Sequence, residues 1–167
     1  IKVADITFGR LQSPDLDVAE EFLTDFGMVK VDRTSDMLFM RGTGTDPVIH
    51  ITHLGASKFL GLGFRANSME DLEKATRLDG ASEIEDLEAP GGGKVVRLND
   101  LHGYLVEIVY GQEQVEEIHV PRMKVNSVDN QDVRTGELMR LPQGPSHVKR
   151  VGHCLLYTSP SPRDQSG

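Results

Sequence analysis

Three histidines and one glutamate are the first candidates for binding a metal or moving a proton, and their positions exclude most shared sites. His50 and His53 lie three positions apart in a strand-like segment, so their side chains point to opposite faces and do not form a metal-binding pair. Glu107 lies in another strand-like segment, where its carboxylate either pairs with a cation in the interior or faces solvent. His102 lies beside Gly103 in an expected turn, which predicts a polar surface residue.

Two other kinds of chemistry have little support. Gly91–Gly93 has the composition of a phosphate-binding loop, but no Lys-Ser or Lys-Thr pair follows it and no helix pattern begins after it. This segment is therefore expected to connect two strands of a hairpin. No serine has the flanking residues of a nucleophile elbow, so the sequence does not predict covalent catalysis by serine.

The overall composition narrows the possible partners. Among 167 residues, 18 are Lys or Arg and 26 are Asp or Glu, which gives a formal net charge of −8 at pH 7. Such a chain lacks the basic face that contacts with nucleic-acid phosphates need. No apolar run approaches the roughly 20 residues of a membrane span, and no signal segment opens the sequence. The single cysteine, Cys154, excludes a disulfide framework, so we expect a soluble cytoplasmic protein.

The first third of the chain alternates strand-like and helix-like patterns. Val3–Phe8 has the pattern of a strand, and Ser13-Pro14-Asp15 then combines a capping hydroxyl, a proline and an acid, which predicts a helix start. Apolar residues recur at helical spacing up to Phe26, and Gly27 is expected to end the helix. Three strands are expected to follow, at Met28–Arg33, Met37–Arg41 and Val48–Thr52.

The next stretch repeats this β-α-β-β-β order. A strand is expected at Phe59–Arg65, followed by a helix over Ser68–Leu78 that begins with the spacing of a capping box. The two helix starts, Asp15 and Ser68, are 53 positions apart, and so are the two helix-ending glycines, Gly27 and Gly80. This common offset predicts an internal duplication. The remaining strands of the second unit are expected at Ser82–Ile84, Lys94–Leu98 and Tyr104–Val109.

Three segments together resemble a known family: Ser13–Phe22, Gly61–Arg65 and Leu101–Glu107. In this order and spacing they are similar to the vicinal oxygen chelate superfamily, which includes glyoxalase I, bleomycin-resistance proteins and type I extradiol dioxygenases. The resemblance covers Ile1–Tyr110. It implies an α+β fold in which two βαβββ units form one cup-like domain with a mixed sheet, here residues 1–112.

Residues 113–149 lack a convincing helix or strand pattern, and this length is too great for a loop within a compact domain. We expect an interdomain linker, followed at 150–153 by the start of a second, truncated domain. Arg140–His153 resembles the bridge between the two domains of type I extradiol dioxygenases. In that subfamily the second domain binds Fe(II) through two histidines and one glutamate, and His153 matches the first histidine. The resemblance therefore implies a parent enzyme that cleaves catechol-type aromatics with O2.

Within the first domain, the metal-ligand positions of the superfamily fall on Phe8, Gly61 and Glu107. Neither a phenyl ring nor a hydrogen binds a metal, and one carboxylate is too few for a transition-metal site. The resemblance thus implies that this domain holds no catalytic metal and that the chain as given is inactive. Its expected contribution is packing, a domain interface and contacts in a homo-oligomer.

Two alternatives remain open. One is a glyoxalase-like lyase or isomerase that uses Zn²⁺ or Ni²⁺ across paired domains. The other is a small-molecule binding protein of the bleomycin-resistance type, with a metal-free cup.

The end of the sequence is expected to have a different origin. Cys154–Asp164 resembles the in-frame translation of a transposase adapter used for DNA libraries. We therefore expect residues 154–167 to be an adapter-derived tail, and the natural protein to continue after His153 with another sequence.

Overall fold

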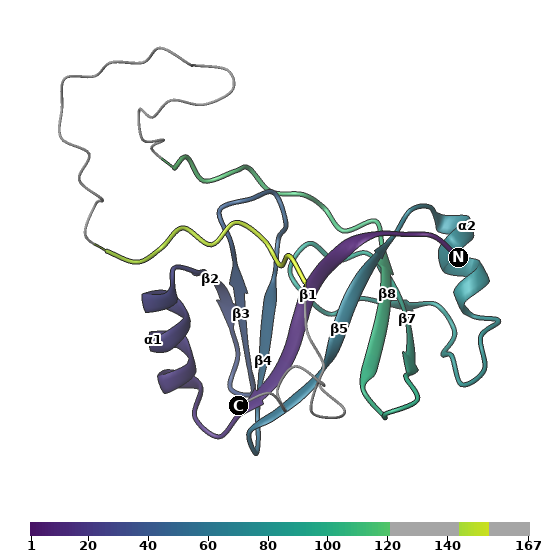
Figure 1. Ribbon diagram of the computed structural model, residues 1–167, viewed down its shortest axis with the longest axis horizontal. Coiled ribbons are helices and arrows are strands. Elements are labelled where there is room, and N and C mark those ends of the chain that lie inside the picture. Colours follow the sequence, from purple (N-terminus) through teal and green to yellow (C-terminus); the bar gives the residue numbers. More distant parts are fainter. Residues whose placement is uncertain (121–143, 154–167) are drawn as a thin grey trace, which may run out of the picture.

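The computed structural model describes residues 1–120 and 144–153, which form one eight-stranded sheet with two helices (Figure 1). The strand order across the sheet is β2-β3-β4-β1-β5-β8-β7-β6. In chain order the elements are β1 (Val3–Ser13), α1 (Leu16–Phe26), β2 (Val29–Arg33), β3 (Met37–Arg41), β4 (His50–Leu54), β5 (Lys58–Ala66), α2 (Met69–Ala75), β6 (Glu85–Asp86), β7 (Lys94–Asn99) and β8 (Leu105–Tyr110). None of the helices in these residues is long and apolar enough to cross a membrane.

The two predicted βαβββ units are confirmed. In the first unit β1 pairs parallel with β4, and in the second β5 pairs parallel with β8. The units join where β1 and β5 run antiparallel at the centre of the sheet. This repeated arrangement confirms the duplication and the α+β fold class.

Asp15, and not Ser13, caps α1. The Asp15 carboxylate accepts hydrogen bonds from the backbone N–H groups of Asp17 (2.8 Å) and Val18 (3.1 Å). Pro14 precedes the cap and so lies outside the first turn. Gly27 ends the helix as predicted, with a left-handed φ of 108° that glycine adopts without strain.

Helix α2 is shorter than predicted. Ser68 caps it by accepting from the backbone N–H of Asp71 (3.2 Å), but the regular helix ends at Ala75. The N–H groups of Arg77 and Leu78 bond to carbonyls three residues back, which tightens the chain out of the α-helical form. The 53-residue offset therefore holds for the two N-caps, whereas Gly80 lies beyond the helix that it was expected to end.

Several strands begin or end at residues other than those predicted, because of pairing across the sheet. β1 continues to Ser13, because Gly9–Ser13 pairs with β4 on one side and largely with β5 on the other. β4 begins at His50 and not at Val48, and β6 is Glu85–Asp86 in place of Ser82–Ile84. Such ends depend on partners distant in the sequence, which local patterns do not report.

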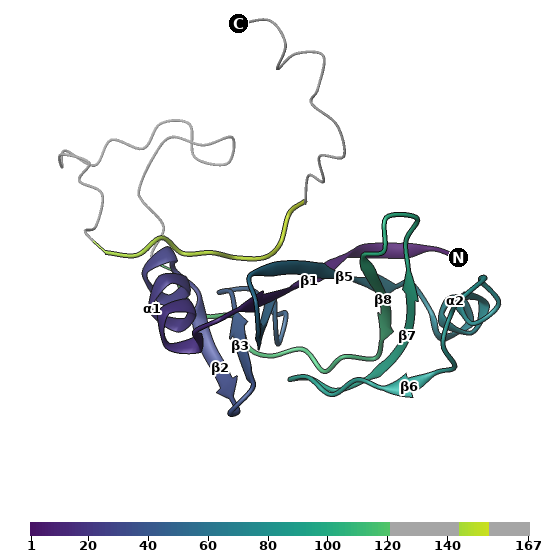
Figure 2. The ribbon, with the colours of Figure 1, turned by 90° about the horizontal axis from the view of Figure 1, so that it is seen from below.

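The sheet curves into a cup with α1 and α2 outside it, as Figure 2 shows. One core cluster contains no helix residue and therefore fills the concave face; its buried members are Phe8, Phe39, Val48, Ile51, Leu87, Val95 and Val109. Two separate clusters attach the helices to the outer face. Leu16 and Leu23 of α1 pack on Leu38 and Met40, and Leu72 and Ala75 of α2 pack with Ala66, Val96 and Ile108.

The segments at the two ends of the expected linker have no helix or strand, yet they contact the sheet domain. The N–H groups of Glu113, Val115 and Ile118 donate to the carbonyls of Gly91, Thr45 and Thr43 at 2.8–3.0 Å. The central part of the linker and the expected adapter-derived tail lie outside the described residues.

Candidate metal centre of the cup

The three positions that the resemblance assigned to metal ligands lie on neighbouring central strands. Phe8 is on β1, Gly61 on β5 and Glu107 on β8. In the register of these strands Phe8 lies opposite Gly63, and Gly63 in turn lies opposite Glu107. The fold thus brings these positions to the centre of the sheet.

The Phe8 ring occupies the first position and is completely buried. A Cβ atom placed on Gly63 would lie 2.6 Å from the ring, so the phenyl group already fills the space across the strand pair. The ring offers no lone pair to a metal.

Gly61 at the second position has no room for any side chain. A Cβ atom there would lie 1.8 Å from the backbone oxygen of Leu105 on β8, far inside van der Waals contact. The close approach of β5 and β8 therefore requires glycine, and a histidine ligand is sterically excluded with this backbone.

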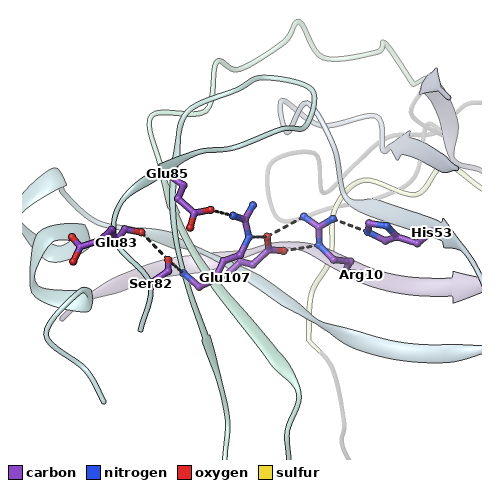
Figure 3. A network of polar contacts seen from close by, with 7 residues as sticks. Arg10, His53, Ser82, Glu83, Glu85 and Glu107 are labelled. Atoms are coloured by element: carbon purple, nitrogen blue, oxygen red, sulfur yellow. Dashed lines mark hydrogen bonds and ion pairs between the residues drawn. The ribbon is translucent and has the colours of Figure 1, made fainter. Parts of the chain in front are cut away.

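Glu107 is completely buried and is bound by two arginines (Figure 3). Arg10 donates from Nε to Oε2 (2.7 Å) and from Nη2 to Oε1 (3.0 Å), a bidentate pair. Arg97 donates from Nε to Oε1 (3.1 Å) and forms a further ion pair with Glu85. The structure thus selects one of the two alternatives open from the sequence, in which the Glu107 carboxylate pairs with cations in the interior.

His53 completes the surroundings of Arg10. Arg10 donates from Nη1 to His53 Nε2 at 2.8 Å, and because arginine can only donate, His53 accepts as the neutral ring. Burial, and then the positive charge of Arg10, lower the pKa of His53, while Glu107 opposes that shift. The guanidinium also lies 5.5 Å from the centre of the Phe8 ring.

His50 lies on the other face of β4, as predicted from its spacing to His53. Its Nε2 is 2.9 Å from the Thr52 hydroxyl oxygen, and burial lowers its pKa to about 4. The two histidines therefore do not share a site.

These donor groups do not fit an iron ion. Of these three positions only Glu107 has a metal-binding side chain, and its oxygens are held by arginines. The imidazole nitrogen of His53 that faces the cup is occupied by the same guanidinium. In the part of the chain that the structure describes, no three His, Cys, Asp or Glu side chains are grouped as metal ligands.

The other residues singled out from the sequence lie away from the cup. His153 is exposed at the end of the described segment 144–153, so its role as a ligand stays a prediction. His102 is exposed in the turn between β7 and β8, as expected. Gly91–Gly93 lies in the connection between the antiparallel strands β6 and β7, which confirms the hairpin.

Sequence reasoning missed Arg10 and Arg97. A signal for Arg10 was present, because it follows Phe8 by two positions in a strand and so shares its buried face. A charged residue at that position indicates a buried partner of opposite charge. Nothing local identified Glu107 as that partner.

The fold is similar to those of solved structures, of which three are described. The Mn(II)-bound glyoxalase from Novosphingobium aromaticivorans matches with a TM-score of 0.66 and 19% identity over 72% of this chain and 43% of its own. Homoprotocatechuate 2,3-dioxygenase from Arthrobacter globiformis matches with a TM-score of 0.60 and 18% identity, over 70% of this chain and 38% of its own. Homoprotocatechuate 2,3-dioxygenase from Brevibacterium fuscum, in complex with 3,4-dihydroxyphenylacetate, matches with a TM-score of 0.62 and 19% identity, over 84% of this chain and 44% of its own.

The chain spans less than half the length of each of these proteins. No protein-family model and no curated protein sequence matches it. The likeness is therefore one of three-dimensional structure, in strand order, helix placement and the curved sheet. On this basis the chain has the vicinal oxygen chelate fold, shared with glyoxalase and extradiol dioxygenases.

Proposed function

We propose that the chain is the N-terminal, non-catalytic domain of a two-domain extradiol ring-cleaving dioxygenase. The observation that carries the proposal is a complete cup whose ligand positions are unsuited to a metal. Phe8 fills one, Gly61 has no room for a side chain, and Glu107 is neutralised by Arg10. The matched dioxygenases are more than twice as long as the part of them that this chain covers, which supports a second domain after it.

In this proposal the Fe(II) site, the catechol-type substrate and O2 belong to the second domain. The ligand contributed by this chain is His153, with a second histidine and a glutamate supplied by the downstream sequence. Residues 1–112 contribute a rigid scaffold and surfaces for contact with other domains or subunits.

The test compares this chain with the longer natural protein obtained by reading the gene beyond the codon of His153. We expect the longer protein to bind about one iron per chain and to form the coloured ring-cleavage product of a catechol. The 167-residue chain should do neither. His153→Ala in the longer protein should abolish iron binding, whereas His147→Ala, a change at an exposed histidine of the same segment, should not. Iron bound stoichiometrically by the short chain, or by the His153→Ala variant, would refute the proposal.

A metal-free binding protein is the second candidate, favoured by a cavity at the rim of the cup. The cavity has a volume of about 560 Å³, and its lining includes Val31, Met37, Phe39, Ala89 and Pro90. A natural stop codon soon after His153, together with saturable binding of an apolar ligand that Met37→Asp abolishes, would favour this function over the dioxygenase.

A glyoxalase-like lyase or isomerase is the third candidate, and the structural match to a Mn(II)-bound glyoxalase supports it. A site with Zn²⁺ or Ni²⁺ shared between paired domains would draw ligands from this cup, which Phe8 and Gly61 do not supply. Turnover of a hemithioacetal by the longer protein, without cleavage of catechols, would identify this activity.

A further inference from the structure

Residues 146–150 run as an extended segment along the outside of the sheet, from the end of α1 toward β1 (Figure 2). We call this segment the strap. Its backbone accepts hydrogen bonds at the Val148 oxygen from Thr43 N–H (2.8 Å) and at the Lys149 oxygen from Gly44 N–H (3.2 Å). The Ser146 hydroxyl donates to the carbonyl of Phe26 (2.7 Å).

The surface under the strap is shaped by glycines. A Cβ atom on Gly42 would lie 2.3 Å from the Lys149 oxygen, and one on Gly27 would lie 1.7 Å from the Ser146 oxygen. The φ angle of Gly42 is outside the left-handed region, so its own backbone conformation does not demand glycine. What demands glycine at position 42 is the strap's main chain.

The loop that contacts the strap, Gly42–Gly44, is itself held in place by hydrogen bonds. The Arg41 side chain donates to the carbonyls of Gly42, Gly44 and Glu116 at 2.8–3.1 Å. Thr43 is bonded on both sides, accepting from Ile118 N–H and donating to Val148. Thr43 therefore binds the chain at two places, at Ile118 before the central part of the linker and at Val148 after it.

Beyond this point ion pairs continue the attachment. Lys149 pairs with Glu117 at 3.3 Å, and Arg150 pairs with Asp5 of β1 at 2.7 Å. Both pairs are largely exposed and contribute little energy. The backbone bonds and the glycine surface are thus the specific part of the contact.

We propose that Phe26–Gly27 and Gly42–Gly44 form a main-chain docking groove whose partner is the strap. The groove makes residues 146–150 a rigid part of the first domain and fixes the position and direction in which the chain continues at His153. In the two-domain protein, and resting there on the proposed function, the groove sets the orientation of the second domain.

The test is amide hydrogen exchange on the 167-residue chain with Gly42→Ala. The Val148 N–H donates to the Gly27 carbonyl at 3.4 Å, so it too reports on the contact. We expect exchange at Thr43, Gly44 and Val148 to speed up by about tenfold or more, while amides of the core strands keep their protection. Gly44→Ala, whose Cβ would lie 3.0 Å from the Lys149 oxygen, should give the same pattern with a smaller change.

Two matched substitutions serve as controls. At Gly152 a Cβ atom meets nothing within 4 Å, and at Gly9 its nearest contact is 3.7 Å away, so alanine at either position should leave these amides unchanged. Unchanged protection in Gly42→Ala would overturn the proposal. An equal loss of protection in the core strands would also overturn it, because Gly42 would then serve the fold and not the docking.

The failure of this inference is distinguishable from the failure of the proposed function. In the longer protein, Gly42→Ala should broaden the distance distribution between spin labels on the two domains. If the short chain shows the expected exchange pattern but the longer protein neither binds iron nor cleaves catechols, the groove stands and the dioxygenase proposal falls. If the longer protein binds iron and cleaves catechols but Gly42→Ala leaves exchange in the short chain unchanged, the dioxygenase proposal stands and the groove falls.

Discussion

Arg10 is a cation held in the interior of the cup by two acceptors, the Glu107 carboxylate and the His53 ring. The arginine and the glutamate are each less than a tenth exposed, so neither charge is solvated by bulk water. Pairing them does not guarantee a gain in stability, but removing one leaves the other buried without compensation. Removing one partner should therefore cost more stability than removing both, and a comparison of such variants tests the pairing.

We predict that Arg10→Met lowers the free energy of unfolding by about 3 kcal/mol, because Glu107 keeps only Arg97 as a partner. The double variant Arg10→Met/Glu107→Gln should recover a large part of that loss, since no buried carboxylate is then left. Urea denaturation of four proteins (the unchanged chain, Arg10→Met, Glu107→Gln and the double variant) measures both effects. A double variant as unstable as the sum of its single changes would contradict the pairing.

His50 makes stability depend on pH. Its pKa in the folded state is lowered to about 4, below the unfolded value near 6.5, so the unfolded chain binds the proton more readily. The stabilising contribution is complete above about pH 6.5 and is lost as pH falls toward 4. We expect His50→Gln to flatten the fall in the unfolding free energy over this window by about 2–3 kcal/mol. An unchanged pH dependence in His50→Gln would contradict this assignment.

At the scale of elements, the two helices begin with side-chain caps at equivalent positions of the two units. Asp15 accepts from two backbone N–H groups and Ser68 from one. The second helix has only seven residues, so its cap accounts for a larger share of its hydrogen bonds. Tertiary packing on the outer face of the sheet supports both helices.

We predict that Asp15→Ala and Ser68→Ala each lower the unfolding free energy by about 1 kcal/mol. Asp25→Ala, on the same helix as Asp15 but near its C-terminal end, is the control and should have an effect near zero or slightly stabilising. Thermal or chemical denaturation followed by circular dichroism measures all three. Equal effects of Asp15→Ala and Asp25→Ala would show that capping is not the cause.

At the scale of the whole molecule, the two units meet along β1 and β5, and Gly61 of β5 lies in that junction, opposite Arg10. We predict that Gly61→Ala destabilises the protein by about 3 kcal/mol or more, because its Cβ atom would overlap the Leu105 carbonyl unless β5 and β8 separate. Gly9→Ala, on the neighbouring strand β1, should be tolerated. Solubility and the urea midpoint of the two variants give the comparison.

The sequence predicted the duplication and the order of elements because caps, turns and strand patterns are local. It also placed His50 and His53 on opposite faces, since a strand's period of two follows from its geometry. It did not predict the surroundings of Glu107, because Arg10 is 97 positions away in the chain and meets it only through the β1–β5–β8 pairing. The steric demand on Gly61 is likewise a product of two strands meeting.

The cation that neutralises Glu107 is covalently part of the polypeptide, with consequences for how the domain is made in a cell. The polypeptide's own side chains neutralise the Glu107 carboxylate, so we predict that residues 1–112 fold without a metal ion from the cell. We expect EDTA to leave the unfolding midpoint of this chain unchanged, and a cell grown under metal starvation to accumulate the domain at its usual level. In the proposed two-domain enzyme, this domain is folded before its neighbour binds iron.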